Sequence, residues 1–296
     1  MRTNTGQILY IPKIGQRADF LHPLMKGCVG WWLFTDGGGD IVKDISENGR
    51  DAILTGTNSW VTDSVGTVNR FDNSSRTSHA ETANTQPDLS SAYTFSAWVK
   101  HEESGLNNFN YYGAGIVLGN SSGSSDLEIY WNTRNVSSQY PQIVHNRSNG
   151  GTFDGFQGIS STKSNDNGVW VHETVTMDGT TFRVYRNGVQ VSSGAVTTAP
   201  LSTAGYKLYI NELPVVSGSS GLTCSMQNVR LWSRALLDSE VFELYINPWA
   251  GLSVTSSTSY FFVPQLITAS PKLFSVSGSS VSMRSNAGRV SVRAAR

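Results

Sequence analysis

Short segments in which apolar and polar residues alternate recur along the chain, and a period of two is typical of β-strands with one buried face. The clearest segment covers residues 93–99. The residues that share its apolar face are Tyr93, Phe95, Ala97 and Val99. A similar segment begins at Val29 and runs through two tryptophans to residue 34. The pattern predicts an all-β protein made of many short strands.

Turn-forming dipeptides separate several of these segments. An Asp-Gly pair at 178–179 and an Asn-Gly pair at 187–188 supply residues that adopt positive φ readily, which is the usual signal of a hairpin. The strands expected around them are 170–177, 181–185 and 189–191. We therefore expect a hairpin followed by a second tight turn and a further strand.

One segment, residues 238–247, has the spacing of a helix instead. The residues at i, i+3 and i+4 on its apolar face are Val241, Leu244 and Tyr245. Asp238 or Ser239 could cap its first turn, and Pro248 would end it. A single short helix among many strands is expected to be an addition to a β-sandwich.

Changes in composition divide the chain into three parts. Residues 1–26 lack a regular pattern and are expected to form an arm, and residues 27–249 should form one β-domain. Residues 250–296 contain five basic and no acidic side chains, which leaves 17 basic and 22 acidic side chains before them. This C-terminal extension has predicted strands at 273–276, 281–283 and 289–293, with a hairpin turn at 278–279. It is too short to build its own core.

The overall composition excludes several classes of protein. The 296 residues carry 22 basic and 22 acidic side chains, so the chain lacks the basic surface that nucleic-acid binding requires. No N-terminal stretch resembles a signal peptide, and the longest apolar stretch, near 260–267, contains Pro264 and is too short to cross a membrane. We therefore expect neither nucleic-acid nor membrane partners.

The two cysteines, Cys28 and Cys224, fall near opposite ends of the predicted domain. The end strands of such a domain often pair side by side, so a disulfide would be feasible. Two buried free thiols are the alternative, and the sequence leaves both open.

Five segments taken together resemble the LamG-like jelly rolls of the concanavalin A-like lectin/glucanase class. The segments are 30–34 with 44–52, Phe71-Asp72-Asn73, 94–100, 170–172 with 185–188, and 229–236 with Glu240, Leu244 and Tyr245. Their order and spacing hold over roughly residues 27–247. The resemblance implies a two-sheet antiparallel jelly-roll sandwich with one short C-terminal helix and extended arms.

The same resemblance covers lectins, glucanases, adhesion modules and phage structural proteins. The Asn-Pro-Trp ending at 247–249, the arm and the tail resemble virion proteins of tailed phages. We expect a non-enzymatic structural protein in the virion, most simply a capsid decoration protein that forms a homo-oligomer and docks through its termini. The alternatives are a glycan-binding host-recognition module of a fibre or spike, and a calcium-dependent lectin or adhesion domain.

Candidate chemistry is sparse. Glucanases of the class place three acids on alternate residues of one strand, whereas here Asp126 and Glu128 are followed by Tyr130, so we expect no catalysis. No cofactor is expected, although Asp72 and Asn73 form a candidate calcium pair, for which an Asx turn is the alternative.

Two sets of residues are candidate binding sites. The candidate glycan-facing residues are Tyr111, Tyr112 and Trp131, in or near the long loops of 102–167. The candidate partner-binding residues of the tail are Phe274, Val276, Arg284, Arg289, Arg293 and Arg296. Alternating apolar residues and unbalanced positive charge suit strand addition to an acidic partner.

Overall fold

A computed structural model gives the fold in two compact units, residues 1–251 and 252–296. It describes side chains at residue 12 and in 15–72, 78–102, 168–196, 202–211 and 223–253. Elsewhere it describes only the backbone of β8 to β12 and β18 to β21.

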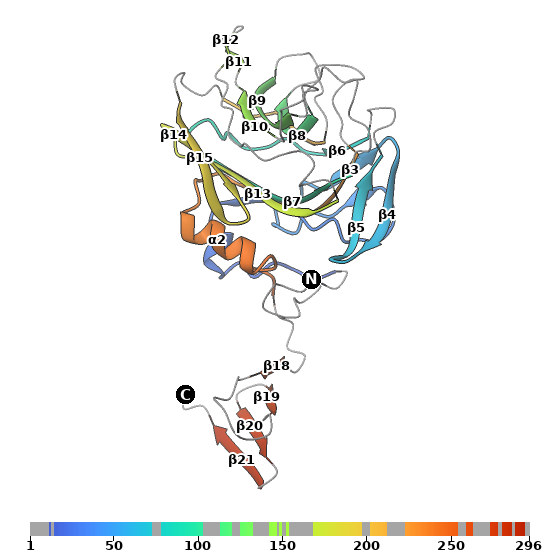
Figure 1. The fold of residues 1–296 in the computed structure, drawn as a ribbon, viewed down its shortest axis with the longest axis vertical. Coiled ribbons are helices and arrows are strands. Elements are labelled where there is room, and N and C mark those ends of the chain that lie inside the picture. The colour runs from blue at the N-terminus through green and yellow to red at the C-terminus, as the bar shows by residue number, and fades with distance from the viewer. Residues whose placement is uncertain are drawn as a thin grey trace. The chain divides into compact units, whose positions relative to one another are not determined.

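The first unit contains an eight-stranded antiparallel sheet (Figure 1). In spatial order its strands are β15 (Val189–Ala195), β14 (Thr181–Arg186), β13 (Trp170–Met177), β7 (Tyr93–His101), β17 (Cys224–Trp232), β5 (Gly66–Phe71) and β4 (Asn58–Asp63). The eighth strand, β1 (Cys28–Trp32), pairs with one end of β17. The hairpins predicted at 178–179 and 187–188 are confirmed, with φ of +50° at Asn187 and +77° at Gly188.

A seven-stranded antiparallel sheet packs against the first. Its strands in order are β10 (Gln142–Asn146), β9 (Ser125–Asn132), β8 (Gly113–Gly119), β16 (Lys207–Ile210), β6 (His79–Thr82), β3 (Ala52–Thr55) and β2 (Ile41–Val42). A small pair is formed by β11 (Ser148–Asn149) and β12 (Thr152–Phe153). The fold is the jelly-roll sandwich that the sequence predicts.

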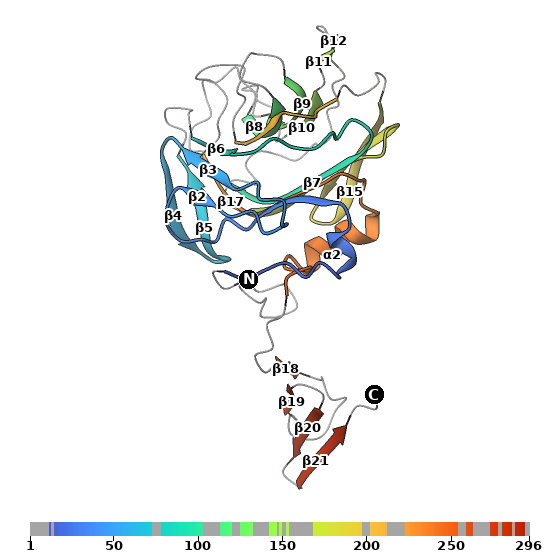
Figure 2. The ribbon, with the colours of Figure 1, turned by 180° about the vertical axis from the view of Figure 1, so that it is seen from behind.

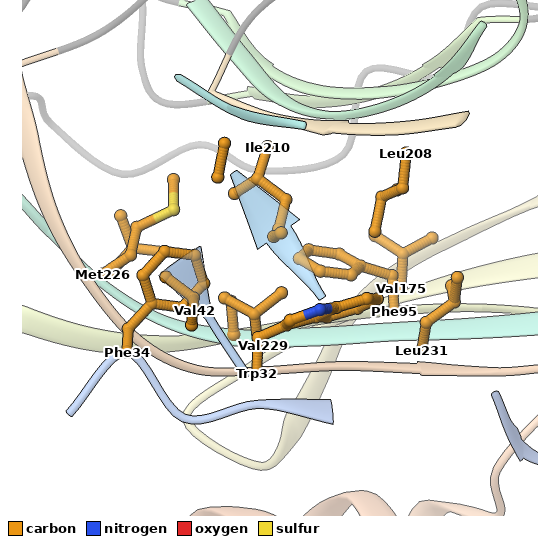
Figure 3. Close-up of a cluster of buried hydrophobic side chains, with 14 of the residues drawn as sticks. Trp32, Phe34, Val42, Phe95, Val175, Leu208, Ile210, Met226, Val229 and Leu231 are labelled. Carbon is orange, nitrogen blue, oxygen red and sulfur yellow. The ribbon is translucent and has the colours of Figure 1, made fainter. Parts of the chain in front are cut away.

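The hydrophobic core fills the space between the two sheets (Figure 3). The four residues predicted to share a face of β7 all lie in it, so the period-two prediction is confirmed. Trp32 is fully buried, and its indole Nε1 donates to the Arg50 carbonyl oxygen at 2.8 Å. Burying each large apolar side chain stabilises the fold by about 1.5–3 kcal/mol, which makes this layer the main source of stability.

A third layer, called the outer layer below, covers the opposite face of the eight-stranded sheet (Figures 1 and 2). It consists of the 3₁₀-helix η1 (Pro23–Met25) and the helix α2 (Asp238–Ile246), which confirms the predicted helix. No helix in the described part of the chain is long and apolar enough to span a bilayer.

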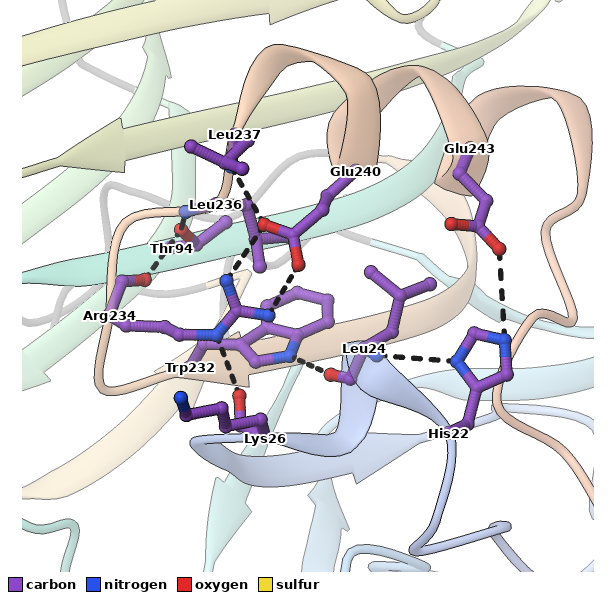
Figure 4. Close-up of polar contacts among 10 residues, drawn as sticks. All are labelled: His22, Leu24, Lys26, Thr94, Trp232, Arg234, Leu236, Leu237, Glu240 and Glu243. Atoms are coloured by element: carbon purple, nitrogen blue, oxygen red, sulfur yellow. Dashed lines mark hydrogen bonds and ion pairs between the residues drawn. The ribbon is translucent and has the colours of Figure 1, made fainter.

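The predicted cap of α2 is wrong. The N-cap residue is Leu237, whose backbone N–H donates to Glu240 Oε2 at 2.8 Å (Figure 4). Asp238 is engaged elsewhere, because its Oδ1 accepts a hydrogen bond from the Tyr185 hydroxyl at 2.7 Å. Tertiary contacts with β14 and with Arg234 therefore decide where the helix begins.

Residues 22–26 lie against the end of β17 and the helix (Figure 4). Leu24 is buried, and its carbonyl oxygen accepts a hydrogen bond from Trp232 Nε1 at 2.6 Å. The Lys26 carbonyl oxygen accepts from Arg234 Nε at 2.7 Å. These contacts make residues 22–26 part of the outer layer.

A disulfide between the cysteines does not form. Cys28 pairs in register with Trp232, whereas Cys224 begins β17 and pairs with Phe71 and His101. Cys224 therefore lies at one end of β17, whereas Cys28 lies on β1 beside the other end of β17. Both are buried free thiols. Of the two alternatives that the sequence leaves open, the buried free thiols are the one found, because β1 pairs with the end of β17 that is far from Cys224.

The second unit is a four-stranded antiparallel sheet. Its strands in order are β18 (Ser259–Phe262), β19 (Leu273–Ser277), β20 (Ser280–Ser285) and β21 (Gly288–Arg293). The predicted hairpin around 278–279 and the final strand are confirmed. The side chains of the tail candidates lie outside the described part of the structure, and Arg296 lies outside it altogether.

Gly188 offers a test of how closely the helix packs on the sheet. A Cβ there would lie 2.9 Å from the Tyr245 Cβ, whereas a Cβ at Gly205 would meet nothing within 4 Å. Both glycines have positive φ, +77° and +86°. Gly205→Ala should therefore cost about 1–2 kcal/mol for its backbone alone, and Gly188→Ala about 1–3 kcal/mol more for the clash. Urea unfolding measures both, and equal costs would mean that α2 is not seated on this turn.

Candidate functional site

A row of side chains crosses the eight-stranded sheet at one end of its strands. The register aligns Trp170 with Lys100, Lys100 with Ser225, and Ser225 with Arg70, on β13, β7, β17 and β5. Directly opposed residues of neighbouring strands lie on the same face of a sheet. We call these four residues, together with the carboxylates Glu102 and Asp63 that contact Lys100, the strand-end row.

The charged members of the row are joined by carboxylates. Glu102 Oε1 accepts from the Ser225 hydroxyl at 2.7 Å and contacts Lys100 Nζ at 2.9 Å. Glu102 Oε2 lies 2.5 Å from Arg70 Nε. Lys100 is also paired with Asp63, so each cation of the row has a carboxylate partner.

Electrostatics keep these groups ionised. Burial would raise the pKa of Glu102, but hydrogen bonds from Arg70, Ser225 and Lys100 outweigh it and leave the pKa below its ordinary value. Burial would also raise the pKa of Asp63, but the Lys100 ammonium and the Ser64 N–H bring that pKa below its ordinary value. The row therefore offers donors and acceptors whose positions are fixed by their neighbours.

Trp170 gives the row an aromatic end. Lys100 Nζ lies 5.9 Å from the centroid of its ring, and the side chain is half-buried. Its indole Nε1 is buried without a hydrogen-bond partner. An aromatic surface beside a few fixed polar groups is the usual chemistry of a site for a polar ligand.

Four segments of the chain leave or join the sheet beside this row. β5 and β7 end here and β13 and β17 begin here, so segments 73–77, 103–112, 154–167 and 212–222 are attached at this edge. Loops positioned by a rigid scaffold commonly carry binding function. The row therefore lies where two strands of the sheet end and two begin.

The candidate glycan-facing residues are only partly reached by the structure. Tyr111 and Tyr112 lie outside the described residues. Trp131 belongs to β9, where it is in register with Gly113 and Ile143, and its side chain lies outside the described part. Their role stays a prediction.

The same holds for the acidic pair weighed for catalysis. Glu128 pairs in register with Val117 and Asn146, and Asp126 falls at a register shift between β8 and β9. Their side chains lie outside the described part.

The candidate calcium pair has one described member. Asp72 Oδ2 lies 3.6 Å from the Arg70 guanidinium, which already supplies a positive charge. Asn73 lies outside the described residues. Among the residues that the structure describes, no group of three or more His, Cys, Asp or Glu side chains could hold a metal ion. Calcium binding stays a prediction.

His172 is buried beneath the helix rather than placed in a site. Its Nε2 lies 2.7 Å from the Ser96 hydroxyl, and its ring lies 5.2 Å from that of Trp98, which stacks on Tyr245. Burial first, and the Arg230 charge second, lower the pKa of His172 to about 3. The imidazole is therefore neutral and packs the outer layer.

The sequence carries a signal for the row at the ends of β5 and β7, which the candidate residues named above do not include. Arg70 and Asp72 flank the last residue of β5, and Lys100 and Glu102 flank the last residue of β7. Opposite charges at matching ends of two apolar strands indicate a charged edge. Only the register showed that Ser225 and Trp170 complete it.

The pKa of His172 predicts how stability falls in acid. The unfolded chain binds a proton below the ordinary pKa of 6.5, whereas the folded protein binds it only near 3. Between these values the unfolded state holds more protons. The free energy of unfolding should therefore fall by about 1.4 kcal/mol per pH unit through this group, in addition to other titrations.

Urea unfolding of the wild type and of His172→Gln between about pH 7 and pH 4 isolates this contribution. Every other titrating group is common to both proteins, so the wild type should show the steeper decline. Parallel declines would mean that the folded protein protonates His172, which contradicts its burial as a neutral ring.

Comparisons with known proteins agree with this fold. The family model described as the concanavalin A-like lectin/glucanases superfamily matches residues 73–242, which is more than half of the chain. A search of curated proteins gives no match.

Several solved structures are similar. The binding domain of Paraclostridial mosquitocidal protein 1 has a TM-score of 0.57 at 18% identity, over 75% of this chain and 52% of that one, so the match spans about half of that domain. Domain 4 of AbnA, a GH43 extracellular arabinanase from Geobacillus stearothermophilus, has a TM-score of 0.53 at 17% identity, over 74% and 98%. The binding domain of botulinum neurotoxin serotype D has a TM-score of 0.58 at 12% identity, over 90% and 74%.

At these identities the structures establish the fold alone. The chain belongs to the concanavalin A-like lectin/glucanase superfamily.

Proposed function

We propose that this protein is a non-catalytic glycan-binding module, which is one of the alternatives that the sequence predicts. The strand-end row carries the proposal, because it combines the ring of Trp170 with ionised Lys100, Arg70 and Glu102 held by one another. Sugars present hydroxyl groups on a partly apolar ring, and fixed polar groups beside an aromatic surface match both.

The named ligands of similar structures support this choice. Domain 4 of AbnA is described in complex with arabinotriose, and a botulinum neurotoxin DC binding domain in complex with SialylT. Another structure of that domain is in complex with rat synaptotagmin II, so a protein receptor is also compatible with the fold. Cell-surface glycan is the partner that the chemistry of the row favours.

The carboxylates of the row do not suit glycoside hydrolysis. A glycosidase needs one carboxylic acid whose pKa is raised so that it can protonate the leaving group. Here Arg70 and Lys100 lower the pKa of Glu102, and Lys100 lowers that of Asp63. Both groups stay ionised and serve as hydrogen-bond acceptors.

A place on a tailed-phage virion, with docking through the terminal arms, stays a prediction from the resemblance. Glycan binding is compatible with it, since a host-recognition module would also be carried by the particle. Proteomic analysis of purified particles would test this location.

Replacing Trp170 tests the proposed site. Trp170→Ala removes the aromatic surface and should weaken glycan binding by at least about tenfold, or about 1.4 kcal/mol. Trp170→Phe retains a ring and should keep most of the affinity. The measurement is binding to an array of neutral and sialylated oligosaccharides, followed by calorimetry with the best ligand.

Thermal unfolding of both variants controls for folding. If folded Trp170→Ala binds as well as the wild type, the row is not the site. If the wild type binds none of the glycans, the proposed function is wrong.

Absence of hydrolysis is a separate expectation. Incubation with β-glucan should release no reducing ends above background, because no described carboxylate of the row can act as an acid. Turnover that is lost in Glu128→Gln would contradict this and assign catalysis to β9.

A further inference from the structure

The outer surface of α2 is unusually apolar for an exposed helix. Phe242 and Ile246, one turn apart, are 46% and 48% exposed. Glu243 lies beside them on the helix and is 3.7 Å from His22, which follows the exposed Phe20 and Leu21. We call Phe242, Glu243 and Ile246 the α2 face. Clustered exposed apolar residues commonly mark an interaction surface.

The α2 face is also acidic. The helix carries Asp238, Glu240 and Glu243 and no basic residue. Glu240 is neutralised by Arg234, whereas Glu243 lies in the last turn, where the backbone presents partial negative charge, with His22 and the buried Arg230 as its positive neighbours. A further cation from outside would stabilise this end of the helix, so the surface suits an apolar and basic partner.

The C-terminal unit has the complementary chemistry. Residues 252–296 contain five basic and no acidic side chains. Within its sheet, Arg284 and Arg289 are paired directly in register on β20 and β21. Like charges opposed across a strand pair destabilise a sheet, so an acidic partner would stabilise this one. The apolar strand residues Phe274 and Val276 belong to the same sheet.

We propose that the α2 face binds the C-terminal unit of a second copy of this chain. Charge complementarity carries this choice, since the chain has an acidic, apolar helix surface and a basic, apolar sheet. Two unlike surfaces make a head-to-tail contact, which builds rings or open chains rather than isologous dimers. The proposal is independent of glycan binding.

The first test is the concentration dependence of mass for the full chain, by sedimentation velocity. Self-association is expected at about 0.1 M salt and should weaken at about 1 M, where the screening length falls from about 10 Å to about 3 Å. A protein that stays monomeric at all concentrations and at low salt overturns the proposal.

Two full-length variants each remove one side of the contact. In the helix variant, Phe242→Ser and Ile246→Ser replace exposed residues. In the sheet variant, Arg284, Arg289 and Arg293 become Ser. Each should lower self-association by at least about tenfold. Ile41→Ser with Ile53→Ser is the matched control, because these residues are similarly exposed, at 49% and 46%, on another sheet. An effect of the control as large as that of the helix variant overturns the proposal.

Mixing the variants distinguishes this contact from any other. The helix variant keeps an intact C-terminal unit, and the sheet variant keeps an intact α2 face. The mixture should therefore form a one-to-one complex, whereas neither variant associates alone. Failure of the mixture to associate, with both variants folded by thermal unfolding, overturns the head-to-tail contact. Glycan binding by the helix variant should be unchanged, so the two proposals fail separately.

Discussion

The outer layer of this protein depends on one buried guanidinium. Arg230 is 1% exposed and lies 3.7 Å from the Trp31 ring centroid. Its Nη1 donates to the Ala250 carbonyl oxygen at 2.8 Å and its Nη2 to that of Pro248 at 2.5 Å. No carboxylate pairs with it among the described residues, so the charge is solvated by these carbonyls and by Asn228 Oδ1, which accepts from Nε at 2.9 Å, and burial lowers its pKa to about 9. A buried ion requires such partners, and they fix the chain after α2 on the sheet.

The need of buried polar groups for partners also governs the face of the eight-stranded sheet that α2 covers, which is polar although it is buried. Ser96, His172 and Thr174 form a hydrogen-bonded line between β7 and β13, and α2 covers them. Because a buried polar group is costly unless it is paired, the helix and residues 22–26 must be placed accurately. Glu240 and Arg234 achieve this by joining the helix start to the end of β17.

The strand-end row lies where the helix no longer covers the sheet. Successive outward positions of β7 are Ser96, Trp98 and Lys100, of which only Lys100 is not buried. Lys100 lies beyond the part of the sheet that the helix covers, and Glu102 and Asp63 neutralise its charge. A jelly roll is shared by proteins of many functions, so the site and not the fold carries the proposal of glycan binding.

The sequence by itself determined the strand pattern, the hairpin turns, the helix and the family. These follow from local alternation and from glycine or asparagine at positive φ, as at Asn187 and Gly188. Local chemistry could not locate the helix cap, since Asp238 is taken by Tyr185 across space. Nor could it separate Cys28 from Cys224. The strand-end row likewise joins residues from four distant segments, because the register of non-adjacent strands is decided by tertiary packing and not by neighbours in the chain.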